Sequence, residues 1–213
     1  MLRPLRLSDA RTLHNVRAAN ESWLLRWEPS SPEGQLRPSA ARSVFSMARK
    51  SPAWPYLSML RQRLEVARGR AIPWAVCYDG QFAGQVTIWS INWGAARSAL
   101  IGYWIDEAYA GRGIIPTALA MAADYSFQVL QLHRLEAGIQ PENIASRRVM
   151  EKLGFREEGT RLREVHVNGI WRDHAYYAIT AEEVPTGLLP RWRRSLAASR
   201  TATGPRDSLR TKT

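Results

Sequence analysis

Two glycines, Gly111 and Gly113, flank an arginine between an apolar run and a helical pattern. Residues 99–105 are rich in aromatic and β-branched side chains, which predicts a buried strand. From Gly113 to about residue 130, apolar residues recur three and four positions apart, which predicts a helix. The N–H groups at the start of such a helix have no intrahelical partner, and glycines leave them uncovered. The stretch can therefore bind phosphate or pyrophosphate, although a tight turn without a ligand is an equally good interpretation of these residues alone.

Two common phosphate-binding loops are excluded at this turn. A dinucleotide-binding fingerprint requires a third glycine where this chain has Pro116, which instead suits the first turn of a helix. A P-loop requires Gly-Lys followed by Ser or Thr, and the turn contains no lysine. The nucleotide carrier, if there is one, must be of another kind.

The net charge of +11 is concentrated at the C-terminal end of the chain. Residues 190–213 hold seven Arg and Lys residues against Asp207, which accounts for +6 of that charge. We expect residues 189–213 to form a disordered basic tail after a single domain over residues 1–188. The alternative is a segment that contacts an acidic partner, such as ribosomal RNA or an anionic cofactor.

The chain has one cysteine, Cys77, which lies in an apolar strand pattern and is expected in the core. A disulfide and a cysteine-rich metal site are excluded, and the four scattered histidines do not predict a metal site. No apolar run reaches the length of a membrane span, and residues 1–9 do not resemble a signal peptide. We therefore expect a cytoplasmic protein without a metal.

The rest of the pattern predicts an α/β domain with a mixed sheet. Helices are expected over residues 10–20, 40–50, 56–68 and 143–153, and strands over residues 2–7, 74–78, 82–89, 134–139, 155–167 and 171–179. Asp79-Gly80 and Asn168-Gly169 are typical of hairpin turns. Leu57, Leu60 and Leu64 share one face of their helix, which suits either the wall of a groove or a cover for the core.

Three segments of the chain carry a family pattern: residues 109–115 (YAGRGII), 141–155 (PENIASRRVMEKLGF) and 167–174 (VNGIWRDH). Together they resemble the GNAT acyltransferases and, within that family, the RimJ and RimL ribosomal-protein N-terminal acetyltransferases. The resemblance covers roughly residues 1–182. It implies the GNAT fold, a mixed and mostly antiparallel sheet of about seven strands with helices on both faces and a splayed pair of central strands. It also implies acetyl-CoA as a co-substrate.

The resemblance assigns contacts with acetyl-CoA to two parts of the chain. In the family the glycine turn holds the CoA pyrophosphate, and here that turn comprises Ala110, Gly111, Arg112, Gly113, Ile114 and Ile115. Ala110 stands at the first position of the family pattern, where an arginine or a glutamine is usual. Ile115 stands at the last position, where a glycine or an alanine is usual. The pantetheine arm is expected along the central strand at Tyr103, Trp104 and Ile105, and at Asn143.

The chemistry to be explained is attack by a neutral amine on a thioester. Many family members protonate the departing thiolate with a tyrosine where this chain has Met150, whereas RimL-like members use a serine that matches Ser146. The alternative role of Ser146 is a helix residue that bonds to its own backbone. Glu164 matches an acidic position that faces the acceptor amine, and its alternative role is a strand carboxylate paired with Arg161 or Arg163.

The resemblance thus predicts acetyl transfer from acetyl-CoA to a primary amine, with the N-terminus of a ribosomal protein as the expected acceptor. A small-molecule amine or an aminoglycoside is the alternative acceptor. A CoA-binding or RNA-binding protein without turnover is the alternative of another class. Monomer and homodimer both stay open.

Overall fold

The computed structural model describes residues 1–30, 32 and 54–202. The seven strands of the described residues form one sheet in the order β1-β2-β3-β4-β5-β7-β6, and of these strand pairs only β4–β5 is parallel. This confirms the predicted mixed, mostly antiparallel sheet. The strands are β1 (Leu2–Pro4), β2 (Ala71–Tyr78), β3 (Gln81–Asn92), β4 (Ser98–Ile105), β5 (Arg134–Ile139), β6 (Arg156–Val167) and β7 (Ile170–Thr180).

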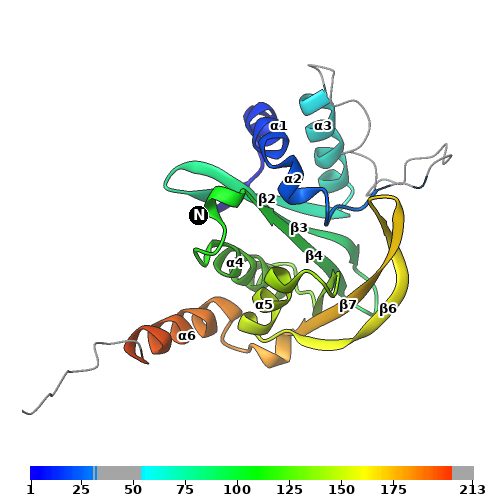
Figure 1. The fold of residues 1–213 in the computed structure, drawn as a ribbon. Coiled ribbons are helices and arrows are strands. Elements are labelled where there is room, and N and C mark those ends of the chain that lie inside the picture. Colours follow the sequence, from blue (N-terminus) through cyan, green and yellow to red (C-terminus); the bar gives the residue numbers. More distant parts are fainter. Residues whose placement is uncertain (31, 33–53, 203–213) are drawn as a thin grey trace, which may run out of the picture.

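Helices cover both faces of the sheet, with α1 and α3 on one side and α4 and α5 on the other (Figure 1). The helices are α1 (Ala10–Ala19), α2 (Glu21–Leu24), α3 (Trp54–Ala67), α4 (Ile114–Gln128), α5 (Ile144–Leu153) and α6 (Leu188–Ala202), with short 3-10 turns η1 (Leu7–Asp9), η2 (Glu107–Tyr109) and η3 (Ala181–Glu183). The predicted helix over residues 40–50 lies outside the described residues. No helix in the described part of the chain has the length and apolar character needed to cross a bilayer.

The larger core lies between the sheet and α4, α5 and α6. Of the predicted stripe on α4, Ile115, Leu119, Ala122 and Ser126 are buried, as an amphipathic helix requires, whereas Val129, just beyond the end of the helix, is exposed. The smaller core lies under α1 and α3 and includes the predicted core residue Cys77.

Both predicted hairpin turns are present, and their backbone explains their residue types. Asp79 and Gly80 have φ of 46° and 78°, and Asn168 and Gly169 have φ of 47° and 84°. Two successive positive φ values are the signature of a type I′ turn, which Asp-Gly and Asn-Gly favour. The chain therefore reverses at these two positions with the twist that the flanking strands need.

The apolar stripe of α3 does not cover the core. Leu57, Leu60 and Leu64 are each about half exposed in the described structure, whereas Met59 is buried beneath α1. The spacing identified the helix correctly but not its buried face. The buried residues of this helix include that methionine and a serine, Ser58, so hydrophobicity alone does not mark its buried face.

Helix α6 corrects the expectation of a disordered tail for residues 189–202. Leu188 and Trp192 are buried in the larger core, and the Trp192 Nε1–H group donates to Thr117 Oγ1 at 2.9 Å. The Asp124 carboxylate on α4 accepts the N–H groups of Leu188 and Leu189, so it satisfies the first turn of α6. Apolar burial and this cap together outweigh the entropy lost on ordering the segment. Residues 203–213 lie outside the described residues.

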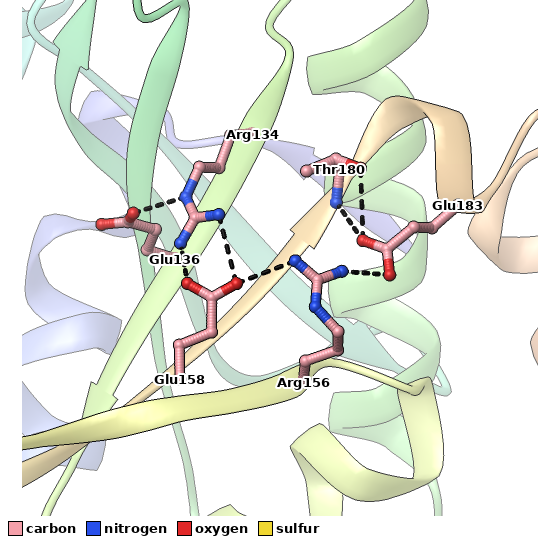
Figure 2. A network of polar contacts seen from close by, with 6 residues as sticks. All are labelled: Arg134, Glu136, Arg156, Glu158, Thr180 and Glu183. Carbon is pink, nitrogen blue, oxygen red and sulfur yellow. Dashed lines mark hydrogen bonds and ion pairs between the residues drawn. The ribbon is translucent and has the colours of Figure 1, made fainter.

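A chain of polar contacts ties the far edge of the sheet to the turn after β7 (Figure 2). Arg134 on β5 contacts both Glu136 and Glu158, and Arg156 bridges Glu158 to Glu183. The Thr180 N–H and hydroxyl then donate to Glu183. The pKa of Glu158 is lowered, chiefly by its hydrogen bond from Arg134. The network therefore joins β5, β6 and β7 to the 3-10 turn η3.

Candidate active site

The parallel pair β4 and β5 separates part-way along its length. The pairing comprises Ser98 with Arg134, Ala99 with Leu135, and Leu100 with Glu136. Beyond Leu100, residues 101–105 of β4 and residues 137–139 of β5 are not paired with each other. The two strands thus splay toward their carboxyl ends, which confirms the predicted splayed pair. The resulting gap leaves backbone groups of β4 open on one side.

The direction of hydrogen bonding shows which groups of β4 face this gap. The Asp106 N–H donates to the Ala83 carbonyl of β3 at 2.8 Å. Because successive N–H groups of a strand point to opposite sides, those of Tyr103 and Ile105 point toward the gap. The N–H of Trp104 points toward β3 instead, where this residue pairs with Gln85. Of the three strand residues predicted to contact the pantetheine arm, Trp104 is thus the one whose N–H group points away from the gap.

The side chain of Trp104 lies on the face of the sheet that α1 and α3 cover. Its ring packs against Phe82, with 5.9 Å between centroids, and the Arg17 guanidinium lies 4.9 Å from it. Burial lowers the pKa of Arg17 to about 10, and Arg17 pairs with Glu28. Trp104 is therefore part of the packing under α1.

The glycine turn presents a row of backbone donors at the end of β4. Gly111 and Gly113 have φ of 76° and 74°, a conformation that L side chains rarely adopt. A Cβ added to either would meet nothing within 4 Å, so the space above the turn is open. Within the described structure, the N–H groups of residues 111–115 donate to no protein acceptor. This row, the amide nest, has the character of an anion-binding site at the N-terminus of α4.

Ala110 does not belong to the amide nest. Its N–H already donates to the Glu107 carbonyl at 3.0 Å, which closes the 3-10 turn before the glycines. The Arg112 guanidinium, 5.6 Å from the Tyr109 ring, adds a positive charge next to the nest. Backbone amides and one arginine can thus bind a pyrophosphate without the polar side chain that Ala110 lacks.

Helix α5 brings two predicted residues to the other side of the gap. The Ser146 N–H donates to Asn143 Oδ1 at 3.1 Å, so Asn143 caps the helix. The Ser146 Oγ lies 2.6 Å from the Tyr103 hydroxyl, and either oxygen can be the donor. Burial raises the pKa of Tyr103, which keeps its hydroxyl protonated near neutral pH. The structure therefore joins Tyr103, Asn143 and Ser146, three residues that the resemblance implied.

Glu164 lies in an irregular stretch of β6. Pairing with β7 shifts between Arg161, opposite His174, and Val165, opposite Arg172. Arg163 has φ of 49°, and its N–H donates to Asp173 Oδ1 at 2.7 Å. A bulge of this kind turns a side chain out of its ordinary alternation, and a strained residue within it is typical of functional sites.

Only one oxygen of the Glu164 carboxylate is used within the described structure. Oε1 accepts from the Tyr176 hydroxyl at 2.8 Å and from Arg161 Nη1 at 2.9 Å. Oε2 is buried and has no partner among the described residues. An unpaired buried carboxylate oxygen is costly, so this atom is suited to a donor from outside the chain.

Glu164 and Ser146 lie on opposite faces of the sheet. Tyr176 and Tyr177 are neighbours on β7 and point to opposite sides. Tyr177 bonds Arg147 of α5 at 2.8 Å, on the side of Ser146, whereas Tyr176 bonds Glu164. The gap between β4 and β5 is the opening between these two faces. The sequence reasoning proposed both residues but could not place them on two sides.

Other reactive residues have structural surroundings. His174 is buried with Nδ1 near the Arg172 carbonyl, and His133 pairs with Glu182 at the surface. In the described ranges, no three His, Cys, Asp or Glu side chains gather as they would around a metal ion. Sequence reasoning missed Tyr176, although it lies two residues after His174 and the alternation of a strand places both on one face.

Residues 1–156 match the family described as Acetyltransferase (GNAT) domain. The chain belongs to the GNAT acetyltransferase family. The solved structure of Mycobacterium smegmatis RimJ in complex with CoA-disulfide matches this GNAT chain with a TM-score of 0.79 and 40% identity, over 93% of this chain and 88% of that one. The resemblance to RimJ-type enzymes and the GNAT fold are both confirmed.

Curated relatives match over different shares of their length. Probable N-acetyltransferase YjcK of Bacillus subtilis is 45% identical over 101 residues, 47% of this chain and 56% of YjcK. Ribosomal protein uS5-alanine N-acetyltransferase of Escherichia coli is 26% identical over 179 residues, 84% of this chain and 86% of that protein. Spermidine N(1)-acetyltransferase of Escherichia coli is 36% identical over 95 residues, 45% of this chain and 50% of that protein. The chain thus spans about half the length of YjcK and of the spermidine enzyme.

Proposed function

We propose that this GNAT protein transfers an acetyl group from acetyl-CoA to the N-terminal α-amino group of a protein. The observation that carries the proposal is the gap between β4 and β5, which opens after Leu100 and lies beside the amide nest of residues 111–115. A gap bordered by open strand amides suits a narrow amide-containing arm, and the nest suits the pyrophosphate at its end. The structural match to RimJ in complex with CoA-disulfide supports this assignment.

Backbone groups do the binding in this proposal. The amide nest and Arg112 hold the pyrophosphate, and the β4 N–H groups that face the gap hold the pantetheine arm. When bound, acetyl-CoA supplies the activated acyl group. The N–H of Ile105, which faces the gap, is our candidate donor to the acyl oxygen as negative charge develops on it. Such preorganised donors, together with positioning, account for most of the rate increase in reactions of this type.

Two side chains handle protons on opposite faces of the sheet. Ser146 donates a proton to the departing sulfur. The Tyr103 hydroxyl, 2.6 Å from Ser146 Oγ, can then supply a proton to Ser146 in its place. Glu164 accepts a proton from the acceptor ammonium through its unpartnered Oε2. An α-amino group has a pKa of about 8, so a modest base suffices near neutral pH.

The charges near Glu164 favour a single ammonium group over a polyamine. On the described part of this face, Arg161 pairs with Glu164 and Arg134 pairs with Glu136 at 2.6 Å. Glu164 Oε2 is the one buried carboxylate oxygen without a partner among the described residues, whereas a polyamine carries several cations that each need a partner. The long match to the uS5-alanine enzyme supports a peptide acceptor, and the shorter match to the spermidine enzyme makes spermidine the second candidate.

A ribosomal acceptor implies a cytoplasmic location, which we propose on that ground. Arg193 and Arg194 are exposed on α6 and add positive charge to this side of the protein. If they assist association with ribosomal RNA, that association weakens steeply as salt increases.

Rates of CoA release with two acceptors test the proposal. The full chain is assayed with acetyl-CoA and either a short peptide that begins with alanine or spermidine. We expect kcat/KM for the peptide to exceed that for spermidine by at least about tenfold, or ~1.4 kcal/mol in transition-state binding. The reverse order would assign the site to polyamines. CoA binding without release with either acceptor would indicate a binding protein without turnover.

A further inference from the structure

The ring of Tyr176 is held from both sides. A Cβ on Gly138 of β5 would lie only 3.2 Å from two ring carbons, so the ring lies flat against the backbone of that strand. From β6, the strand on the other side of β7, the Arg161 guanidinium carbon lies 3.7 Å from the ring centroid. This stacking leaves the ring little freedom to rotate or tilt. The direction of the Tyr176 hydroxyl is therefore fixed by two neighbouring strands.

The fixed hydroxyl determines which oxygen of Glu164 is occupied. Tyr176 and Arg161 both donate to Oε1, at 2.8 and 2.9 Å, so the two donors meet at one oxygen. Oε2 is left buried and unpartnered within the described structure. Without a donor on Oε1, the carboxylate could turn about its last bond and exchange the two oxygens. The stack of Gly138, Tyr176 and Arg161 thus selects the oxygen that stays without a partner.

We propose that Tyr176 is a positioning residue for acetyl transfer, which holds Glu164 so that Oε2 receives the proton of the acceptor ammonium. This inference rests on the proposed function. The proton passes from the ammonium nitrogen to Oε2, and the electron pair of that N–H bond stays on nitrogen as the lone pair that attacks the thioester. Tyr176 keeps its own proton throughout. Burial and the neighbouring Glu164 raise the pKa of Tyr176 to about 12, so the hydroxyl remains a donor at neutral pH.

Asp173 supports the same arrangement through a hydrogen bond to the backbone of β6. Its carboxylate accepts the Arg163 N–H at 2.7 Å and so stabilises the bulge that carries Glu164. The other charged group near Tyr176 and Arg161 is Glu136, which is itself paired with Arg134. Among the described carboxylates, Glu164 is thus the one with a buried oxygen that has no partner.

The test compares Tyr176→Phe with Tyr177→Phe. Tyr177 is a matched control because its buried hydroxyl also donates to a glutamate, Glu157, and bonds an arginine, but on the other face of the sheet. We expect Tyr176→Phe to lower kcat/KM for the peptide amine on the order of tenfold, the usual effect of a hydrogen bond to a charged group. KM for acetyl-CoA should stay unchanged in both variants, and Tyr177→Phe should keep the wild-type kcat/KM for the amine.

A double-mutant cycle shows whether Tyr176 acts through Glu164. Glu164→Ala should lower kcat/KM strongly, and adding Tyr176→Phe to it should cause no further loss. An equal loss in both backgrounds, or wild-type rates for Tyr176→Phe, would overturn the positioning role. Wild-type rates for Glu164→Ala would overturn it too, and would leave the acceptor of the proposed function to be tested separately.

Gly138→Ala carries the test if Tyr176→Phe fails to fold. The added Cβ pushes the Tyr176 ring by a few tenths of an ångström without removing its hydroxyl. The loss in kcat/KM for the amine should have the same direction and be smaller, with KM for acetyl-CoA unchanged. Wild-type kinetics in Gly138→Ala would contradict the proposal, since the ring would then need no exact placement.

Discussion

The hydroxyl of Tyr103 lies 2.6 Å from Ser146 Oγ and joins the open half of β4 to the first turn of α5. The contact spans the gap where the two central strands separate. A serine on a helix would otherwise bond its own backbone, as Ser195 does with the Trp192 carbonyl at 2.8 Å. Ser146 is thus held with its hydroxyl toward the place where we propose that the thioester sulfur departs.

Ser146→Ala should lower kcat by roughly 10²-fold while the Kd for acetyl-CoA changes little. The loss falls on kcat because the departing sulfur needs the proton only in the transition state. Steady-state kinetics with a peptide acceptor and calorimetry with acetyl-CoA measure the two quantities. Ser195→Ala is the control, since its hydroxyl also lies on a helix but away from the gap. A wild-type kcat in Ser146→Ala would return this serine to a structural role.

Gly113→Asp should weaken CoA binding more than Gly113→Asn. Both side chains tolerate the positive φ of this position better than most, and they have nearly the same size. They differ in charge, and only the aspartate repels a pyrophosphate held by the amide nest. We expect the Kd for CoA to differ between them by at least about tenfold, or ~1.4 kcal/mol. Equal Kd values in two folded variants, measured by calorimetry, would argue against phosphate at this turn.

Trp192→Ala should destabilise the protein by about 3–5 kcal/mol, as expected when a buried tryptophan is truncated. The side chain is buried between α4 and α6, and its hydrogen bond to Thr117 is lost as well. Urea unfolding measures the change in the free energy of unfolding. Arg193→Ala, at an exposed position next to it, should stay within about 0.5 kcal/mol of wild type. A similar small change for Trp192→Ala would mean that α6 is not part of the folded domain.

The ion pairs at the sheet edge predict a pH-dependent stability. The pKa of Glu158 is lowered by Arg134, so its contribution is complete above the unfolded-state pKa of about 4.3. It disappears as the pH falls through the lower pKa of the folded state. Glu158→Gln should therefore be less stable than wild type by roughly 0.5–1 kcal/mol at pH 7, since these side chains are partly exposed. Unfolding curves that stay equally far apart at pH 7 and at pH 2 would contradict this origin.

The sequence predicted the elements around the gap because their signals are local. The strand before the glycines, the helix after them, and both hairpin turns follow from periodicity and from residues that favour positive φ. The mixed sheet of about seven strands and the splay of its central pair followed from the family resemblance, whereas the order of the strands was not predicted. No pattern in residues 98–105 shows that pairing with β5 ends at Leu100, because the end of a ladder depends on two strands far apart in the chain.

Three features escaped prediction for physical reasons. Helix α6 has Leu188 and Trp192 four residues apart, but its many arginines gave it the composition of a tail. The buried face of α3 is decided by packing against α1, whereas its leucines face outward. Tyr176 could not be linked to Glu164 because a bulge in β6 changes the register between them. Alternation alone does not predict such a bulge.

The most direct test of the central claim is to locate the acetyl group on a peptide that has both an α-amine and a lysine side chain. The full chain is incubated with acetyl-CoA and this peptide, and tandem mass spectrometry identifies the modified nitrogen. The account predicts acetylation at the N-terminal nitrogen, abolished when the peptide N-terminus is blocked and strongly reduced by Glu164→Ala. Acetylation of the lysine alone, or no acetylation of a peptide while spermidine is acetylated, would contradict it.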